Sequence, residues 1–303
     1  MCGFLYAAQP DWGCAITILP PWGWIVPGLL LAALGFQRER WRRAAGVVAI
    51  WLVYGLAFSE EPHVLARSLL PRDQRDGRRW RVVTLNCGAD APVAAMEETI
   101  AYQPDIILLQ ESPPPEKVAA FAQRCFSGAG TAIFGGDVSL VARGEVTAHD
   151  APSSERWWLL RAHVRRSGGD EVEVMCLRLK PHLAGPDMFS VDYWRGHRDV
   201  RQQQRGQVAT VMKWLNAIPA SLPVIVGGDF NAPSGDPIYR PLGPRLRDAF
   251  GTAGRGWGDT FANEFPAVRI DQVWVSGQFF ICDARVHRTQ HSDHRLVVVD
   301  LVL

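Results

Sequence analysis

The sequence has 303 residues, of which 48% are hydrophobic and 21% are charged, and this composition predicts a globular protein and excludes a disordered chain. The net charge is +1. Residues 1–79 hold 9 Lys/Arg and 6 Asp/Glu, so the remaining chain is near −2 and lacks the overall basic field that drives non-specific nucleic-acid binding. Six cysteines without zinc-type spacing indicate buried thiols rather than a disulfide or zinc scaffold.

Two apolar runs predict a membrane anchor over residues 1–58. The first run, 14–36, carries no charge and is long enough to cross a bilayer. The second run, 44–58, reaches only ~22 Å of the ~30 Å needed. A signal peptide fits poorly because no Lys or Arg precedes the first run and prolines interrupt it, and a soluble core hairpin is the other alternative. We therefore expect a transmembrane helical hairpin and an integral protein of the cell membrane.

The charges beside the apolar runs predict an orientation. The loop at 37–43 holds four Arg and one Glu, so the positive-inside rule puts this loop in the cytoplasm and the rest of the chain on the extracytoplasmic side. Arg67 and Arg72 follow the second run and weaken this asymmetry. Residues 59–79 are polar and charged, and they predict a linker whose basic end could lie against anionic lipid headgroups.

From Trp80 onward, short apolar runs alternate with helical patterns, which predicts an α/β domain over 80–303 with helices packed outside mixed sheets. Asp90 is placed to cap the first of the helices. The expected helices cover 91–103, 116–125 and 196–217, and the expected strands cover 81–86, 105–111, 131–134, 138–143, 156–165, 171–179, 269–276, 279–286, 295–303 and the run from Pro223 to Asp229.

Polar side chains follow several of these strands at the point where each strand ends. Open α/β sheets bring such side chains together, and carboxylate and amide oxygens are the ligands that hard divalent cations prefer. A His held by a carboxylate can transfer protons or stabilise charge near neutral pH. Each group alone also fits a turn or a surface acid, so the prediction depends on their occurring together: Asn86, Glu111, Asp229, Asn231, Asp271 and the "HSDH" at 291–294.

Five motifs in this order, "TLNCG", "LLQES", "GGDFNAP", "RIDQVWVS" and "SDHRLVVVDL", resemble the endonuclease/exonuclease/phosphatase family, which includes deoxyribonuclease I-like enzymes. The resemblance covers about residues 80–303. It implies a four-layer α/β sandwich, in which two mixed β-sheets are flanked by helices, and Mg²⁺-assisted hydrolysis of a phosphate ester, with Mn²⁺ as an alternative metal.

The same resemblance implies roles for individual residues. Glu111 is the expected principal metal ligand, with Asn86 and Asp293 in support. Asp229 would orient or deprotonate the attacking water, and Asn231 would bond the phosphoryl group. His294, paired with Asp271, would stabilise the transition state or act as acid or base. Family members differ over which of Asp229 and His294 is the base, so both assignments stay open.

One motif departs from the family pattern. Relatives place a His or Tyr after the central strand, whereas this chain reads "CLRLKPHL". His182 is the predicted equivalent, and Lys180 or Arg178 could contact the phosphate instead. The following connection, 183–205, is long and rich in Arg; it predicts Arg201 as a further substrate contact, with a packed helix entry as the alternative.

The resulting hypothesis is a membrane-tethered, Mg²⁺-dependent phosphoesterase that hydrolyses phosphodiester bonds, or phosphomonoester bonds, in the manner of an endonuclease or exonuclease. An alternative substrate is a phospholipid, sphingomyelin or inositol-phosphate headgroup. An alternative of another class is a non-catalytic, membrane-anchored binding scaffold. The sequence indicates no protein partner.

Overall fold

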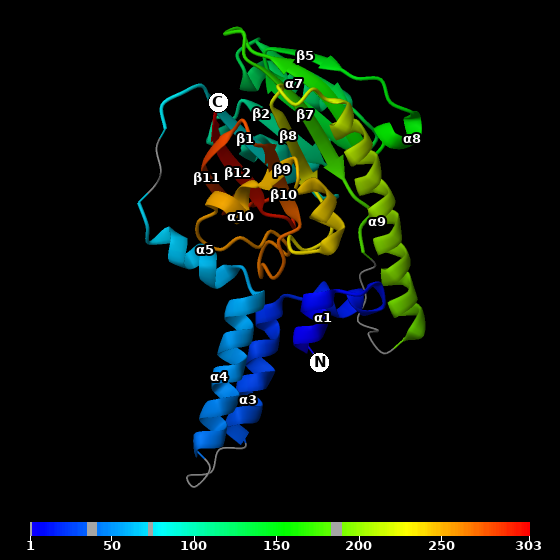
Figure 1. The fold of residues 1–303 in the computed structure, drawn as a ribbon. Helices are drawn as coiled ribbons and strands as arrows, with labels where there is room; N and C mark the ends of the chain where they lie inside the picture. The colour runs from blue at the N-terminus through cyan, green and yellow to red at the C-terminus, as the bar shows by residue number, and fades with distance from the viewer. Residues whose placement is uncertain (1, 35–40, 72–74, 183–189) are drawn as a thin grey trace.

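The computed structural model describes residues 2–34, 41–71, 75–182 and 190–303, and most of them belong to two six-stranded sheets packed face to face (Figure 1). The first sheet has the order β11 (Phe280–His287), β12 (Leu296–Val302), β1 (Arg79–Asn86), β2 (Ile106–Gln110), β4 (Val138–Arg143) and β3 (Gly130–Phe134). The second has the order β5 (Glu145–Ala148), β6 (Leu159–Arg165), β7 (Glu171–Arg178), β8 (Val224–Asp229), β10 (Asp271–Ser276) and β9 (Leu246–Asp248).

Each sheet has one parallel pair near its centre, β1 with β2 and β7 with β8, and its other neighbouring strands are antiparallel. Both sheets are therefore mixed, which confirms the prediction from the sequence. The parallel pairs matter for function because the carboxyl ends of parallel neighbours lie at the same edge of a sheet.

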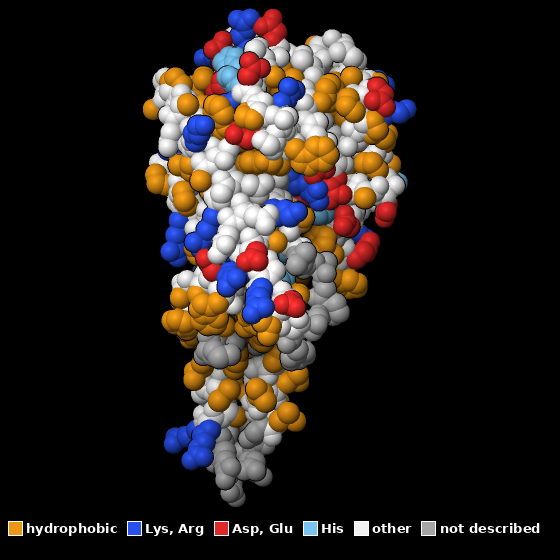
Figure 2. Space-filling model, turned by 90° about the vertical axis from the view of Figure 1, so that its right-hand side faces the viewer, with side chains coloured by type: hydrophobic (Ala, Val, Ile, Leu, Met, Phe, Trp, Pro, Cys, Tyr) orange, Lys and Arg blue, Asp and Glu red, His pale blue; other side chains and the backbone are white. Residues whose placement is uncertain are grey.

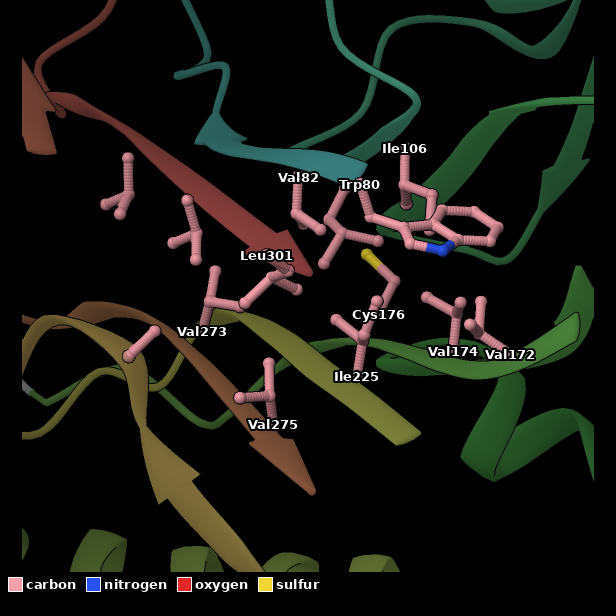
Figure 3. Close-up of a cluster of buried hydrophobic side chains, with 14 of the residues drawn as sticks. Trp80, Val82, Ile106, Val172, Val174, Cys176, Ile225, Val273, Val275 and Leu301 are labelled. Carbon is pink, nitrogen blue, oxygen red and sulfur yellow. The ribbon is translucent and has the colours of Figure 1, made fainter. Parts of the chain in front are cut away.

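The core has three apolar layers because successive strand residues point to opposite faces. Between the sheets, Val82, Ile225 and their neighbours form the central cluster (Figure 3). On the outer face of the first sheet, Val83 packs against α6 (Pro92–Glu98) and α7 (Pro115–Cys125) through side chains such as Met96 and Phe121. On the outer face of the second sheet lies α9 (Val191–Ala217). Helices thus flank both sheets and complete four layers.

Several expected boundaries differ from the structure. Asp90 does not cap the first helix, because α6 has Ala91 as its N-cap residue and no side-chain cap bond. The strand predicted to begin at 156 begins at Leu159, since α8 (Ser153–Arg156) precedes it. The long helix begins at Val191, where Ser190 accepts a hydrogen bond from the Asp192 N–H. β5, β9 and α10 (Ala249–Ala253) were not predicted, because each is only three to five residues long.

Helices α3 (Ile25–Leu34) and α4 (Trp41–Phe58) form a hairpin that projects from the sandwich (Figure 1). Trp51 of α4 packs over Gly28 of α3, where an added Cβ would lie 2.1 Å from the indole. Helix α4 has 18 residues, a length of ~27 Å, and only 11% of it is buried, so by length and apolar composition it could cross a membrane.

The first apolar run does not form one straight helix. Residues 11–17 and 21–34 form helical segments that meet at 74°, so the described part of the span 14–36 is bent. Only the segment after the bend joins the hairpin, while α1 (Cys2–Ala8) and α2 (Cys14–Thr17) lie beside the sandwich, with α2 in contact with α9. Residues 37–40 of the predicted cytoplasmic loop lie outside the described residues.

The predicted linker 59–79 also has structure of its own. It contains α5 (Glu61–Ser68), whose Val64 is 2% exposed and belongs to the central cluster, and its last residue begins β1. Arg67 donates hydrogen bonds to the carbonyls of Phe250, Gly251 and Gly254 near α10. The segment at the base of the hairpin is therefore packed against the sandwich and hydrogen-bonded to it. Within this predicted linker, residues 72–74 lie outside the described residues.

Candidate active site

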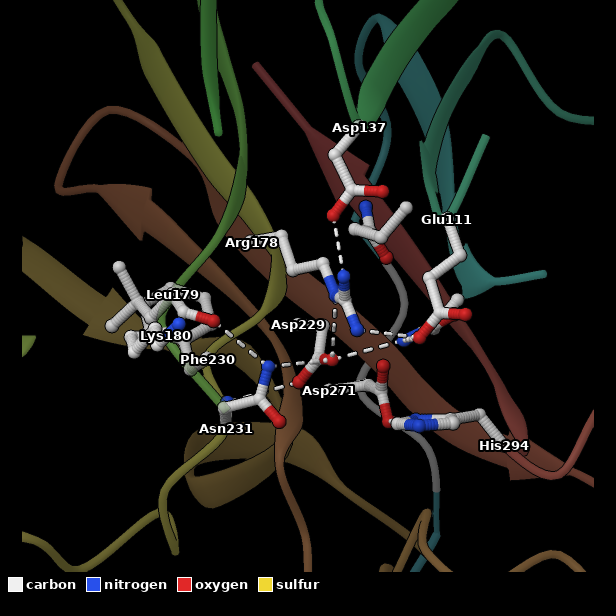
Figure 4. A network of polar contacts seen from close by, with 12 residues as sticks. Glu111, Asp137, Arg178, Leu179, Lys180, Asp229, Phe230, Asn231, Asp271 and His294 are labelled. Atoms are coloured by element: carbon white, nitrogen blue, oxygen red, sulfur yellow. Dashed lines mark hydrogen bonds and ion pairs between the residues drawn. The ribbon is translucent and has the colours of Figure 1, made fainter. Parts of the chain in front are cut away.

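The predicted site residues meet at one end of the sandwich, where strands from both sheets finish (Figure 4). Asn86 and Asp229 are the last residues of β1 and β8, and Glu111 directly follows β2. Asp271 opens β10, which runs antiparallel to β8, so the register pairs Asp271 with Asp229. Side chains that are far apart in the sequence therefore lie together because the strands that carry them end at the same edge of the sandwich.

Asp229, Asp271 and His294 form the buried centre of this site. Nδ1 of His294 lies 2.8 Å from Oδ2 of Asp271, and one ligand atom from each of the three residues lies within 4.8 Å of the others. Both carboxylates are 0% exposed and His294 is 5% exposed. Phe261 covers the imidazole, with ring centroids 4.9 Å apart. The predicted pairing of His294 with Asp271 is present in the structure.

The burial of these groups changes their proton affinities. Burial, and then the charge of Asp271, raises the pKa of Asp229 above its ordinary value. Burial alone would lower the pKa of His294, but the charge and hydrogen bond of Asp271 outweigh burial and raise it. The raised pKa favours the protonated form of His294, whose positive charge then lies beside two carboxylates. Such an arrangement can stabilise negative charge that develops on a reacting group.

Asn231 holds Asp229 in place from the neighbouring turn. Its backbone N–H donates to Oδ1 of Asp229 at 2.9 Å, and its Nδ2 donates to Oδ2 of Asp229, also at 2.9 Å. The same Nδ2 donates to the Leu179 carbonyl at 2.9 Å, and the φ of Asn231 is +49°. Gln204 of α9 donates to the Asn231 carbonyl. Asn231 thus lies beside the expected base, where an amide can also reach a bound phosphoryl group.

Asn86 links carboxylates in this structure rather than offering its oxygen to a metal. Its Nδ2 donates to Oε1 of Glu111 at 3.2 Å and to Oδ2 of Asp229 at 3.0 Å, while its Oδ1 accepts the Gly88 N–H. Asp293 is exposed and its Oδ1 lies beside Gly88, at the end of β1. In this structure Asn86 therefore positions Glu111 and Asp229, and its expected role as a metal ligand stays a prediction.

The donor chemistry fits a divalent cation. Glu111, Asp229 and Asp271 supply carboxylates, and Asp293 lies at the rim. Oδ1 of Asp271 is buried without a hydrogen-bond partner among the described residues. A buried carboxylate oxygen without a partner is costly unless a cation or water satisfies it. Oxygen donors of this kind match Mg²⁺ or Mn²⁺.

The structure does not bring three other predicted residues into this cluster. His182 packs against His197 of α9, with the two Nδ1 atoms 3.0 Å apart, and burial lowers the pKa of His182 to about 4. The Lys180 side chain is exposed. Arg201 is wrong as a substrate contact, because its side chain is 1% exposed and its Nη2 is bound to Asp236 at 2.8 Å.

Arg178 is the basic residue that reaches the cluster instead, from the end of β7. The strand-end pattern that selected Glu111 and Asp229 also applies to Arg178, so the signal was present in the sequence. Of the Arg-rich connection 183–205, residues 183–189 lie outside the described residues.

Comparisons with known proteins agree with this geometry. The model of the Endonuclease/Exonuclease/phosphatase family matches residues 83–294. The Escherichia coli K12 protein YbhP is 29% identical over 111 residues, which are 36% of this chain and 42% of YbhP. The chain thus matches about two fifths of the length of this curated relative.

Solved structures show the same fold. An endonuclease/exonuclease/phosphatase from Bacteroides vulgatus has a TM-score of 0.59 at 17% identity and covers 75% of this chain and 99% of its own. A mannosyl-6-phosphatase from Bacteroides thetaiotaomicron has a TM-score of 0.57 at 18% identity, with coverage of 74% and 100%. D. rerio TDP2, complexed with a single-strand DNA product, has a TM-score of 0.55 at 18% identity, with coverage of 74% and 99%.

The family match spans more than two thirds of the chain and includes every strand end that contributes to the buried cluster. The chain therefore belongs to the Endonuclease/Exonuclease/phosphatase family.

Proposed function

We propose that this protein hydrolyses phosphodiester bonds with the help of a divalent cation, Mg²⁺ or Mn²⁺. The observation that carries the proposal is the buried group of Asp229, Asp271 and His294 beside Glu111. A non-catalytic scaffold would gain nothing from burying two carboxylates and a charged imidazole together, because burying charged groups is costly. Glu111, with Asp293 at the rim, would hold the cation, which when bound polarises the phosphoryl oxygens.

The residues of this chain then have distinct tasks. Asp229, oriented by Asn86 and Asn231, accepts a proton from the attacking water. The water oxygen forms a bond to phosphorus, the bond from phosphorus to the leaving oxygen breaks, and that oxygen takes up a proton. Protonated His294, held by Asp271, stabilises the negative charge that develops on the phosphoryl group. This assignment makes Asp229 the base, because the contact with Asp271 favours the protonated form of His294.

We also propose that the α3–α4 hairpin inserts into the cell membrane. Helix α4 exposes several large apolar side chains, Ile50, Leu52, Val53 and Leu56 among them, and hydrophobic side chains are spread over the projecting hairpin in Figure 2. Large exposed apolar areas mark protein or membrane contact sites. The basic loop at 37–43 supports a cytoplasmic hairpin tip and an extracytoplasmic hydrolase domain.

The position of the site favours a substrate at the membrane surface. The carboxyl ends of β7 and β8 point toward the end of the sandwich from which the hairpin projects (Figure 1). Ser234, a few residues after Asp229, donates a hydrogen bond to Glu60 at 3.1 Å, and Glu60 follows α4 by two residues. A phospholipid, sphingomyelin or inositol-phosphate headgroup is therefore the substrate class we favour. A nucleic-acid phosphodiester is the second candidate, favoured by the structural likeness to TDP2 with its single-strand DNA product.

The test uses the full-length protein in lipid nanodiscs. It measures Mg²⁺-dependent hydrolysis of sphingomyelin, glycerophospholipid, inositol phosphates, plasmid DNA and single-stranded DNA, with Glu111→Gln as the inactive control. Turnover of a headgroup substrate that exceeds turnover of both DNAs supports the membrane assignment. Turnover of DNA alone would support a nucleic-acid phosphodiester as the substrate instead. Failure of the chain to remain with membranes after carbonate extraction would refute the insertion of the hairpin.

A further inference from the structure

Arg178 occupies a special position in the sandwich. It is the last residue of β7, and the parallel register between β7 and β8 pairs it with Asp229. Its backbone N–H donates to the Trp158 carbonyl at 2.8 Å, which fixes the strand end. The side chain is 21% exposed, so it lies at the mouth of the site and faces inward (Figure 4).

Three carboxylates surround the Arg178 guanidinium. Nη2 donates to Oε1 of Glu111 at 2.5 Å, and Nη1 donates to Oδ2 of Asp137 at 2.5 Å. Nε lies 3.8 Å from Oδ2 of Asp229 and has no hydrogen-bond partner among the described residues. The guanidinium therefore lies between the expected metal ligand and the expected base.

The charge balance of the site explains why a basic side chain is needed there. Four carboxylates meet at this point, those of Glu111, Asp137, Asp229 and Asp271, and they would repel an anionic phosphate ester. A guanidinium matches phosphate geometry with two parallel N–H donors, and it stays charged at every physiological pH. Arg178 is thus suited to bring the anion to the carboxylates.

We propose that Arg178 binds the non-bridging phosphate oxygens of the substrate and that Asp137 positions its guanidinium. This inference rests on the proposed phosphodiester hydrolysis. His182 packs on α9 and the Lys180 side chain is exposed, so neither supplies this contact.

The same geometry couples Arg178 to cation binding. Oε1 of Glu111 already accepts the short hydrogen bond from Nη2, so Arg178 and a divalent cation compete for that oxygen. When Glu111 releases Nη2, Nη1 stays on Asp137, and the freed N–H groups face the position of the substrate. Removal of the guanidinium should therefore weaken phosphate binding and strengthen cation binding at the same time.

The test measures binding to the full-length protein in detergent by calorimetry, with inorganic phosphate and Mg²⁺ as separate probes. Arg178→Gln should weaken phosphate binding about tenfold or more, the loss expected for a charged hydrogen-bonded pair, and should tighten Mg²⁺ binding. Arg165→Gln is the matched control, because Arg165 is 53% exposed and pairs with Glu145 at the surface; it should change either affinity by less than about twofold.

Two further variants keep the test decisive if Arg178→Gln unfolds. Arg178→Lys keeps the charge but cannot form the bidentate hydrogen bonds of a guanidinium, so its phosphate affinity should fall between those of the wild type and the Gln variant. Asp137→Asn should raise KM for a bis-aryl phosphodiester more than it lowers kcat. Unchanged phosphate and Mg²⁺ affinities in the Arg178 variants would overturn the inference. A wild type that binds phosphate but never hydrolyses would contradict the proposed function instead.

Discussion

Arg269 joins the base of the hairpin to the strand that carries Asp271, and its replacement by Ala should destabilise the protein strongly. Its guanidinium is 3% exposed and holds Glu60 at 2.8 Å and Asp248 at 2.5 Å. Removing one partner from a buried ion pair costs about 3–5 kcal/mol, because the carboxylates left behind, here 31% and 16% exposed, lose the cation that compensates them. In a domain of this size each kcal/mol lowers Tm by about 2–4 °C, so Arg269→Ala should lower Tm by about 6–20 °C.

The assay is thermal unfolding in detergent micelles, followed by circular dichroism. Arg288→Ala is the matched control, since Arg288 and Glu264 pair at the surface with side chains 61% and 63% exposed. That change should cost less than about 1 kcal/mol. Combining Arg269→Met with Glu60→Gln and Asp248→Asn removes the charges of all three side chains and should recover most of the lost stability. Each kcal/mol corresponds to about 2–4 °C in Tm. A Tm of Arg269→Ala within about 2 °C of the control would therefore mean that the Arg269 ion pairs do not stabilise the fold.

Three other predictions concern pH, the hairpin and the catalytic turn. Burial, and then the charge of Glu61, raises the pKa of Asp259 to about 7, so the stability that the neutral carboxyl provides is lost as pH rises through about 7. Asp259→Asn should therefore have a higher Tm than the wild type at pH 8, with the difference vanishing toward pH 4. Gly28→Val should separate α3 from α4, because its Cβ would overlap Trp51, and lower Tm in detergent, whereas Gly46→Ala on the open face of α4 should not. Asn231→Ala removes the Nδ2 donor to Asp229 and should lower kcat about 100-fold, as measured on a bis-aryl phosphodiester. It should also lower Tm, because Ala is strained at a φ of +49° and the Leu179 carbonyl loses its donor.

The sequence predicted the strands of the sandwich well where burial dominates. The runs around Ile106–Gln110 and Val224–Asp229 are apolar on both faces because each strand lies between a second sheet and a helix layer. A polar residue at the end of such an apolar run stands out in the sequence. Glu111 and Asp229 could therefore be predicted as site residues from the sequence alone.

The membrane anchor was harder to predict, because hydropathy does not distinguish a lipid environment from a protein interior. Cys14, Ala15 and Thr17 belong to an uncharged run, yet they are buried in α2, which contacts α9. The prolines mark the bend before Pro21 in the sequence, but they did not reveal that the residues before the bend pack beside the sandwich.

Long-range ion pairs account for the error at Arg201. Asp11 and Asp236, which compensate its charge, lie 190 and 35 residues away along the chain, so no local pattern could reveal that this Arg is buried. Arg178 is the opposite case. The carboxylates that contact Arg178 are also distant in the sequence, but the position of Arg178 near the end of a predicted strand could be seen. His182 and Lys180 were preferred because of the family pattern.

The most direct test of the central claim is the hydrolysis of a bis-aryl phosphodiester by the full-length protein, with and without Mg²⁺, compared between the wild type and Asp229→Asn. We expect turnover that requires Mg²⁺, and a loss of about 100-fold or more in the variant, which keeps the shape of the side chain but cannot accept the proton. Its Tm should stay at or above that of the wild type, since the buried charge is removed. Equal turnover by both proteins, or turnover that does not respond to removal of the metal, would contradict the assignment of this site.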